Sequence, residues 1–298
     1  MKRGPALAVA FVSTALVLGV AWSVSGGAVT VWGLPAPLVL GAGALLLQWL
    51  AFLPAFALKT ETFYDLLGAL TFLSLVGGAA WIACEQVGAY PARMVSALLV
   101  CVWAIRLGRY LFGRVKAVGH DVRFDEIKHN GPQFFMTWTL QGAWTFLTSL
   151  SVLVVITAQG EGPAIGPWSI VGWSLWLIGF AIEVIADRQK TAFRARQSGP
   201  RRWIDEGLWA YAQHPNYFGE MLLWLGLFIA GADVYQGVQW VTVISPLFVV
   251  FLLTQVSGIP MLKAQGKRRW GDDPAYQAYL DRTHLLIPWP SRRDSSAP

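Results

Sequence analysis

Long apolar runs without charged residues alternate with short polar segments along most of this chain. A transmembrane helix needs about 20 predominantly apolar residues, so a run of that length indicates a membrane span. The pattern predicts an all-α protein, a polytopic membrane helix bundle with seven or eight transmembrane helices. The expected spans are residues 1–25, 35–58, 66–84, 93–112, 134–158, 168–186, 217–230 and 238–258.

The first expected span allows two interpretations. Lys2 and Arg3 precede an apolar run over residues 5–22, and a cleaved signal peptide shows the same order of charged and apolar residues. The apolar run is longer than a usual signal core. We therefore expect the first span to be retained.

Composition supports insertion into a membrane. The 298 residues are 55% hydrophobic and only 13% charged, whereas about a quarter of the residues of a soluble domain are charged. The net charge of +6 does not indicate nucleic-acid binding, because the cations lie in short loops beside the expected spans. The expected partners are the lipid bilayer and a lipophilic small molecule, and nothing in the sequence indicates an oligomeric state.

The distribution of cations predicts the orientation in the membrane. Both termini, the turn at Lys59 and the loops after the fourth and sixth spans are basic, whereas the loops around Glu85, Glu161 and Asp233 contain no lysine or arginine. With eight spans, every basic segment falls on one side, which the positive-inside rule assigns to the cytoplasm. We expect one integral membrane domain over residues 1–298, in a bacterial inner membrane, with cytoplasmic termini.

A polar stretch, residues 186–220, separates the sixth and seventh expected spans. It holds six cationic residues: Arg188, Lys190, Arg194, Arg196, Arg201 and Arg202. If the sixth span continues as a helix past the membrane, Asp187, Lys190 and Arg194 share one face. Two cations and one acid suit a nucleotide, because the cations can bind phosphates and the carboxylate can accept from a ribose or amide. Alternatively, these cations only anchor the loop at the membrane surface.

The stretch ends in the polar cluster His214-Pro215-Asn216-Tyr217-Phe218-Gly219-Glu220. Pro215 can begin a helix, which places Asn216 and Glu220 four residues apart on one face. Gly219 allows a ligand or another helix to approach closely. An acid inside an apolar span is costly unless it is paired or faces a cavity, so Glu220 indicates a functional site. Alternatively, Asn216 and Glu220 brace the bundle by internal hydrogen bonds.

Two further polar groups lie at the ends of expected spans. Arg106 and Tyr110 are four residues apart near the end of the fourth span, where they either line a site or anchor the helix. Glu61, Tyr64 and Asp65 precede or open the third span. They either polarise a substrate carbonyl or cap the helix.

Standard cofactor and metal motifs are missing from the sequence. There is no glycine-rich Rossmann or Walker pattern and no nucleophile elbow. His120 and His129 lie in a loop with acids, but their spacing matches no standard metal site, and we expect no bound metal.

The second half of the chain resembles a known family. Asp187, Arg194, the cluster from Asn216 to Glu220 and an ending with Tyr276, Tyr279 and Leu286-Ile287-Pro288-Trp289 are similar to the C-terminal domain of steroid 5-alpha-reductases. The resemblance covers roughly residues 93–289 and looks strongest for a bacterial branch whose substrates are mostly unassigned. The wider group includes sterol reductases and isoprenylcysteine carboxyl methyltransferases, which share the His-Pro-x-Tyr-x-Gly element.

The resemblance implies that NADPH is held from the cytosolic side of a membrane helix bundle. Four residues match the family's cofactor-binding Asp, Arg, Asn and Glu: Asp187, Arg194, Asn216 and Glu220. Two more match an Arg-x-x-x-Tyr pair: Arg106 and Tyr110. Three resemble cofactor-contacting positions of the sterol reductases: Lys190, His214 and Tyr217.

The substrate side departs from the family's pattern. The steroid enzymes hold the 3-keto group of the substrate with a Gln-Glu pair and a tyrosine. Here Trp103 stands at the tyrosine position, and no early span contains a Gln-Glu pair. The resemblance therefore implies a steroid- or isoprenoid-like lipophilic substrate rather than a steroid itself. If the reaction needs an acid, Tyr64, Glu61 or Asp65 is expected to supply it.

The leading hypothesis is a membrane-embedded reductase that passes a hydride from NADPH to an activated, enone-like C=C bond. The first alternative is a methyltransferase that uses S-adenosylmethionine. It explains the polar cluster equally well, but it needs fewer phosphate-binding cations, and Gln213 stands where those enzymes usually have arginine. The second alternative is a lipid-binding or assembly protein, which accounts for basic loops but not for Asn216 and Glu220 inside a span.

Overall fold

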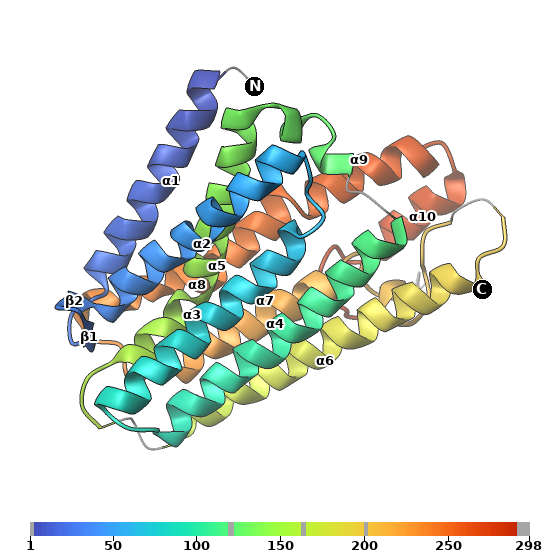
Figure 1. The fold of residues 1–298 in the computed structure, drawn as a ribbon. Coiled ribbons are helices and arrows are strands. Elements are labelled where there is room, and N and C mark those ends of the chain that lie inside the picture. The colour runs from blue at the N-terminus through green and yellow to red at the C-terminus, as the bar shows by residue number, and fades with distance from the viewer. Residues whose placement is uncertain (1–2, 119–121, 162–164, 200–201, 291–298) are drawn as a thin grey trace. The chain divides into compact units, whose positions relative to one another are not determined.

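The computed structural model describes residues 3–118, 122–161, 165–199 and 202–290 (Figure 1). His120 and Arg201 lie outside these ranges. Within them, seven helices are long and apolar enough to cross a membrane, which confirms the expected all-α polytopic membrane helix bundle. Their bounds are Gly4–Ser23, Ala36–Leu58, Tyr64–Gln86, Pro91–Leu111, Gly131–Thr157, Pro167–Arg196 and Gly237–Trp270.

The chain divides into two compact units. Unit 1 comprises Met1–Ile170 and Leu227–Ser245, and unit 2 comprises Val171–Gly226 and Pro246–Pro298. Helix α6 (Pro167–Arg196) begins in unit 1 and continues into unit 2, and α7 (Pro215–Ala230) begins in unit 2 and ends in unit 1.

Unit 1 is built around one central helix. Its elements are α1 (Arg3–Ser23), β1 (Thr30–Val31), β2 (Leu34–Pro35), α2 (Ala36–Leu58), α3 (Tyr64–Gln86), α4 (Pro91–Val118), η1 (Val122–Phe124), η2 (Ile127–His129), α5 (Gly131–Thr157) and η4 (Gly237–Val243). Helix α5 packs against α1, α2, α3 and α4. Its most apolar stretch is 89% buried, whereas no other candidate span exceeds 44%. The strands β1 and β2 form a short antiparallel hairpin.

Several polar side chains of the central helix form hydrogen bonds within the bundle, as a low-dielectric environment favours. Thr145, Ser149 and Thr157 donate hydrogen bonds to carbonyls of their own helix. Gln141 Nε2 donates to the Tyr64 carbonyl on α3 at 2.8 Å. The Gln141 bond therefore ties α5 to α3, and the other three bonds stay within α5.

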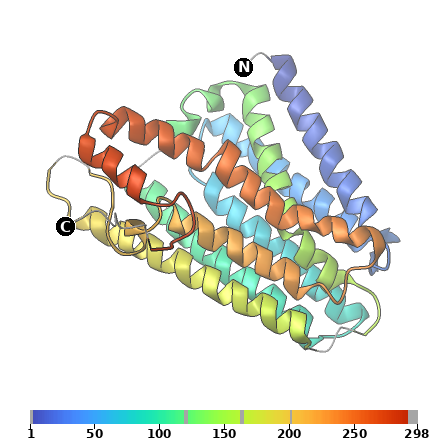
Figure 2. The same cartoon turned by 180° about the vertical axis from the view of Figure 1, so that it is seen from behind.

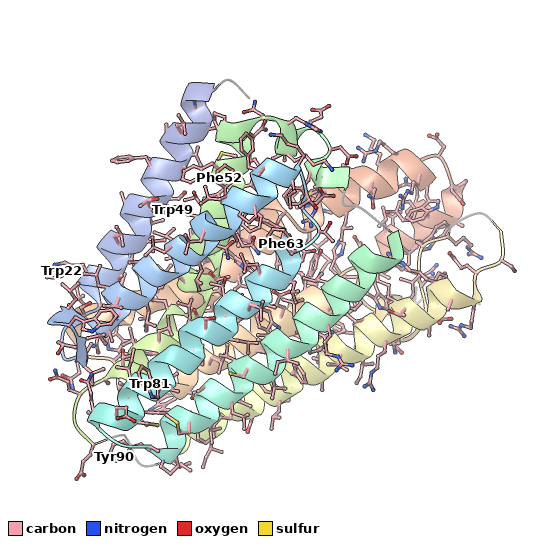
Figure 3. All side chains as sticks on the ribbon, in the orientation of Figure 1. Trp22, Trp49, Phe52, Phe63, Trp81 and Tyr90 are labelled. Atoms are coloured by element: carbon pink, nitrogen blue, oxygen red, sulfur yellow. The ribbon has the colours of Figure 1, made fainter. Side chains whose placement is uncertain are left out.

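Large aromatic side chains lie on the outside of unit 1. Trp22 near the end of α1 and Trp81 near the end of α3 are 64% and 68% exposed (Figure 3). Tryptophan is enriched at membrane interfaces because its apolar ring and its N–H suit the headgroup region. These positions are therefore consistent with contact to lipid.

Unit 2 holds the shorter helices and most of the polar stretch. Its elements are the greater part of α6, η3 (Gly207–Ala210), the greater part of α7, the greater part of α8 (Ile244–Phe251), the π-helical segment η5 (Leu252–Val256), α9 (Ile259–Trp270) and α10 (Pro274–Arg282). Helix α6 extends ten residues beyond the expected end of the sixth span. The sixth span therefore continues as a helix, and Asp187, Lys190 and Arg194 all lie on it.

The last two expected spans differ from the helices that form. Helix α7 has 16 residues, which is shorter than the about 20 residues of an ordinary span. The eighth expected span, 238–258, is the first part of a longer helical run that continues as α9 and is coloured orange in Figure 2. The run continues because the polar segment after residue 258 is itself an amphipathic helix.

Glycines allow α6 and α7 to approach each other closely in unit 2. A Cβ atom on Gly179 would lie 2.6 Å from the Gly219 carbonyl oxygen, and one on Gly219 would lie 2.5 Å from the Gly179 oxygen. A Cβ atom on Gly226 would lie 2.5 Å from the Gly172 carbonyl oxygen. Each of these glycines is seven residues from the corresponding glycine of the first pair. The glycine of the polar cluster thus serves the approach of another helix.

Candidate functional site

A cavity of about 640 Å³ lies within unit 2, and its volume is in the range of small-molecule and cofactor sites. Side chains from α6, residues 202–214, α9 and α10 line it. Among the described residues that line it, the charged side chains are one acid, Asp272, and six cations: Lys190, Arg194, Arg202, Lys263, Lys267 and Arg269. Such an excess of positive charge favours a ligand that carries phosphate groups.

Hydrogen bonds anchor the segment between α6 and α7 to α6. Trp209 Nε1 donates to the Ala186 carbonyl at 3.0 Å, and Gln189 Oε1 accepts from the Leu208 amide at 2.9 Å. Gly207 precedes them with φ of 60°, and a Cβ there would collide with the Gln189 side chain. The chain needs glycine at this turn, which brings the segment back over the cationic face of α6.

Aromatic side chains form one wall of the cavity. Trp203 lies 5.1 Å from Tyr276 and 6.0 Å from Trp270 between ring centroids. The Tyr279 hydroxyl donates to the Trp209 carbonyl at 3.1 Å, and burial raises the pKa of that hydroxyl above its usual range. Trp203 Nε1 is buried and has no hydrogen-bond partner among the described residues. The wall therefore offers flat apolar rings and a spare donor.

Three of the predicted site residues line this cavity: Lys190, Arg194 and His214. The Lys190 ammonium lies 4.7 Å from the centroid of the Trp209 ring. His214 stacks on Tyr217 with 5.5 Å between ring centroids. Burial, reinforced by the positive charges of Lys190 and Lys263, lowers the pKa of His214 to about 4. The imidazole is therefore neutral at physiological pH.

A hydrogen bond joins two further predicted residues across α6 and α7. Asn216 Nδ2 donates to Asp187 Oδ1 at 3.2 Å, and Asp187 is only 8% exposed. Asp187, Asn216, Tyr217 and Glu220 are not among the described residues that line the cavity. They lie on the same two helices as Lys190 and His214. The Asp187–Asn216 bond is the kind of internal brace that the alternative interpretation of the cluster expects.

The remaining predicted residues belong to unit 1. Arg106 and Tyr110 lie one turn apart on α4, and both are half-buried. Glu61, Tyr64 and Asp65 lie at the turn from α2 into α3.

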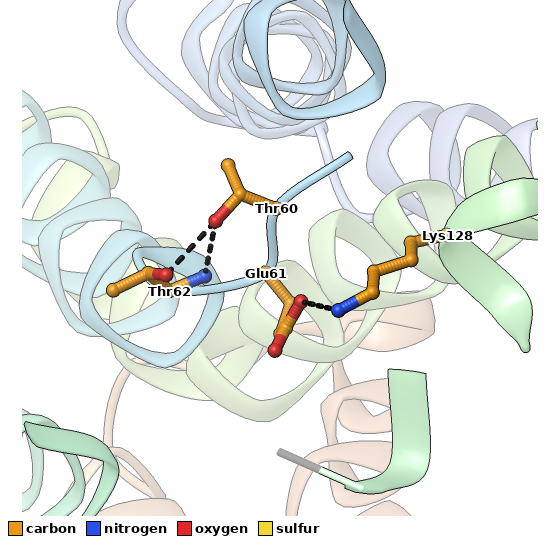
Figure 4. A network of polar contacts seen from close by, with 4 residues as sticks. All are labelled: Thr60, Glu61, Thr62 and Lys128. Atoms are coloured by element: carbon orange, nitrogen blue, oxygen red, sulfur yellow. Dashed lines mark hydrogen bonds and ion pairs between the residues drawn. The ribbon is translucent and has the colours of Figure 1, made fainter. Parts of the chain in front are cut away.

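The acids at that turn form ion pairs with the segment before α5. Glu61 Oε2 lies 3.0 Å from Lys128 Nζ, with the two side chains only 5% and 18% exposed (Figure 4). Asp65 lies 3.5 Å from Arg123. These pairs hold residues 122–129 against the beginning of α3.

Tyr64 is enclosed by aromatic rings beside these ion pairs. Its ring centroid lies 4.8 Å from that of Phe124 and 5.1 Å from that of Trp138. Its hydroxyl donates to the Thr137 carbonyl at 3.1 Å. The hydroxyl is thus held in one orientation by α5.

Several lining residues were not predicted as site residues. They are Trp203 and, on α9 and α10, Lys263, Lys267, Arg269, Tyr276 and Tyr279. A signal for the α9 residues is present in the sequence, because Lys263 and Lys267 are four residues apart and share one face of a polar helix. Nothing local connects that face with α6, which lies some 70 residues earlier.

Comparison with known proteins gives distant relatives. An uncharacterized protein of Schizosaccharomyces pombe is 21% identical over 222 residues, which cover 65% of this chain and 63% of that protein. The 3-oxo-5-alpha-steroid 4-dehydrogenase 1 of Rattus norvegicus is 26% identical over 123 residues, which cover 41% of this chain and 42% of that enzyme. No solved structure matches the chain significantly.

The similarity to the rat enzyme supports the resemblance to steroid 5-alpha-reductases at the level of the superfamily. A family match covers far more of the chain, from residue 51 to residue 283. That range includes α3 to α9 and all the predicted site residues. The protein therefore belongs to the family described as Protein of unknown function (DUF1295).

Proposed function

We propose that this protein is a membrane-embedded, NADPH-dependent reductase of an activated C=C bond in a lipophilic, steroid- or isoprenoid-like substrate. The observation that carries the proposal is the cavity in unit 2, whose described lining holds six cations and one acid. The distant similarity to a 3-oxo-5-alpha-steroid 4-dehydrogenase supports a redox reaction on such a substrate.

The residues of the cavity fit the chemistry of NADPH. Lys190 and Arg194 on α6, with Lys263, Lys267 and Arg269 on α9, would hold its phosphates. The rings of Trp203 and Trp270 offer stacking surfaces for its bases, and the spare Trp203 donor offers a hydrogen bond. When bound, NADPH supplies the hydride. Neutral His214 adds a hydrogen-bonding group without further positive charge.

The other predicted residues complete the proposal. We assign cofactor binding to four residues of α6 and α7: Asp187, Asn216, Tyr217 and Glu220. We assign the same role to Arg106 and Tyr110 on α4. The braced Asp187–Asn216 pair keeps an acid and an amide in fixed positions beside Lys190. Fixed polar groups lower the entropic cost of ligand binding.

Tyr64, with Glu61 and Asp65, remains our assignment for the acid that polarises the substrate carbonyl. A donor there would stabilise the negative charge that develops on the carbonyl oxygen. Replacing Tyr64 by Phe should leave NADPH binding intact and abolish turnover of an enone substrate. Full turnover by this variant would transfer the role to another group.

The membrane setting of the proposal follows the charge distribution. The lipophilic substrate would enter from the bilayer and the cofactor from the cytosol, where the basic cavity would lie. We place the protein in a bacterial inner membrane with both termini in the cytoplasm.

The test is ligand-induced thermal stabilisation of the detergent-purified protein. NADPH, NADH and S-adenosylmethionine are titrated side by side, because a ligand that binds the folded state raises the melting temperature by mass action. We expect NADPH to stabilise the protein. Stabilisation by S-adenosylmethionine alone would overturn the reductase and favour the methyltransferase.

Helix α9 offers a matched pair of variants for the same assay. Lys267 lines the cavity, whereas its exposed neighbour Arg268 does not. Lys267→Gln should weaken NADPH binding by about tenfold, which corresponds to about 1.4 kcal/mol, and Arg268→Gln should not. Asn216→Ala or Glu220→Ala should abolish binding at normal expression. Equal losses for Lys267→Gln and Arg268→Gln would show that only general charge matters.

A further inference from the structure

A second cavity, of about 350 Å³, lies in unit 1. It is formed where α1 and α5 end, where α4 begins and where α7 leads into η4. Its lining is almost entirely polar or glycine: Gly26, Gly27, Arg93, Ala158, Gln159, Glu161, Asp233, Val234, Gln236 and Gln239. The ends of membrane-spanning helices lie near the lipid headgroups, so we expect this cavity at headgroup depth.

Hydrogen bonds between loops fix the walls of this cavity. Gln159 Nε2 donates to the Ala28 carbonyl at 2.9 Å, and Gln239 Nε2 donates to the Gly26 carbonyl at 2.6 Å. Gln239 Oε1 accepts from the Gln236 amide at 3.0 Å. Both carboxamides are thus engaged in joining the loops, which makes the cavity a built feature of unit 1.

Arg93 is the cation of this cavity, and its charge is poorly compensated. Its side chain is 1% exposed, and Nη2 donates to the Gly160 carbonyl at 3.2 Å. The guanidinium carbon lies 5.1 Å from the ring centroid of Tyr90, which Figure 3 labels at the beginning of α4. Nε and Nη1 are buried without a hydrogen-bond partner among the described residues. A buried guanidinium normally has an anionic partner.

The position of Arg93 in its helix adds to this imbalance. Arg93 lies in the first turn of α4, and that turn contains no acid. A helix N-terminus carries partial positive charge and unsatisfied N–H groups, so it favours an anion and disfavours a cation. The guanidinium of Arg93 and the N-terminus of α4 would therefore both stabilise a bound anion.

The acids of the cavity do not supply the negative charge that would pair with Arg93. Glu161 and Asp233 line the cavity but are exposed, and within the described part of the chain neither forms an ion pair with Arg93. The cavity thus has a buried positive end and exposed negative groups. A simple dianion would satisfy Arg93 but would be repelled by the two carboxylates.

We propose that this cavity binds a zwitterionic phosphate ester, with the phosphate against Arg93 and an ammonium group at Glu161 and Asp233. Phosphoethanolamine, either free or as the headgroup of an aminophospholipid, has this distribution of charge. The site is separate from the cavity in unit 2 and does not depend on the proposed reductase activity.

The first experiment titrates the delipidated full-length protein with phosphoethanolamine and with glycerol 3-phosphate, and follows the melting temperature. We expect phosphoethanolamine to bind at least tenfold more tightly. Equal affinity for the two esters would overturn the proposal.

Exposed acids provide variants that should fold normally. The double variant Glu161→Gln, Asp233→Asn should lose the preference for phosphoethanolamine. The control Glu85→Gln, an exposed acid that does not line the cavity, should keep it. A preference that survives in the double variant would contradict the assignment of the ammonium group. Arg93→Gln should abolish binding of both phosphates, and unchanged affinity there would contradict the assignment of the phosphate.

A second experiment distinguishes the two sources of the headgroup. The protein is reconstituted with equal amounts of phosphatidylethanolamine and phosphatidylglycerol, and retained lipid is identified by native mass spectrometry. Retention of phosphatidylethanolamine by the wild type, and its loss in the double variant, would identify a lipid site. If only free phosphoethanolamine binds in the first experiment, the ligand is the soluble ester; binding of neither form excludes the proposal.

Discussion

His214 shows at the residue scale how burial sets the charge of a site. Lys190 and Lys263 are its charged neighbours in the cavity, and their positive charges disfavour an imidazolium. Burial and the charges of Lys190 and Lys263 keep the imidazole neutral by lowering its pKa to about 4 from an ordinary value of 6.5. A phosphate in the cavity would remove part of this repulsion, so ligand binding should raise the pKa of His214.

The pH dependence of stability tests this description of His214. Between pH 6.5 and about 4, the unfolded chain binds a proton at this side chain and the folded protein does not. Acid therefore favours unfolding in this window, by roughly 3 kcal/mol at its lower end. His214→Gln should lose less stability than the wild type when the pH falls from 7 to 4, as measured by chemical denaturation. Equal losses would show that His214 titrates normally.

Contact between α6 and α7 positions the site residues at the element scale. Gly179 and Gly219 let the two backbones touch, and the same closeness brings Asn216 within hydrogen-bonding distance of Asp187. The glycine and the polar residues of the 214–220 cluster therefore act together. Gly219 allows a short separation of α6 and α7, and this separation lets Asn216 reach Asp187.

Substitution of Gly219 by Ala should destabilise the protein by about 1–3 kcal/mol. The new methyl group would meet the Gly179 carbonyl and the Glu183 amide, which are backbone atoms that cannot move aside. Gly77→Ala on α3 is the control, because nothing lies within 4 Å of its Cβ position and alanine favours a helix. Thermal unfolding of both variants gives the comparison. A Gly219→Ala protein as stable as the wild type would show that α6 and α7 separate readily.

At the scale of the whole molecule, the chain returns to the end from which α6 departs. Glu161 lies before α6 and Asp233 lies after α7, yet both line the cavity of unit 1. The two helices must therefore lead away from this end and back again. Helix α7 makes this return with only 16 residues, and the orientation derived from eight alternating segments stays a prediction.

Labelling with a membrane-impermeant maleimide tests the orientation. In a background without Cys84 and Cys101, single cysteines replace Glu161, Asp233 and Arg268, all of which are exposed. We expect Glu161→Cys and Asp233→Cys to react from outside intact spheroplasts, and Arg268→Cys to react only after lysis. Opposite labelling of Glu161→Cys and Asp233→Cys would contradict the return through α7.

The sequence by itself determined the class of fold, the approximate spans and the shared face of Asp187, Lys190 and Arg194. Those features depend on apolar length and helical periodicity, which act over a few turns of one helix. Only the tertiary structure brought Lys263 and Lys267 to the cavity that Lys190 lines, paired Glu61 with Lys128 and buried Arg93 beside a polar cavity. These arrangements depend on packing between distant helices, and no local pattern specifies which faces will meet.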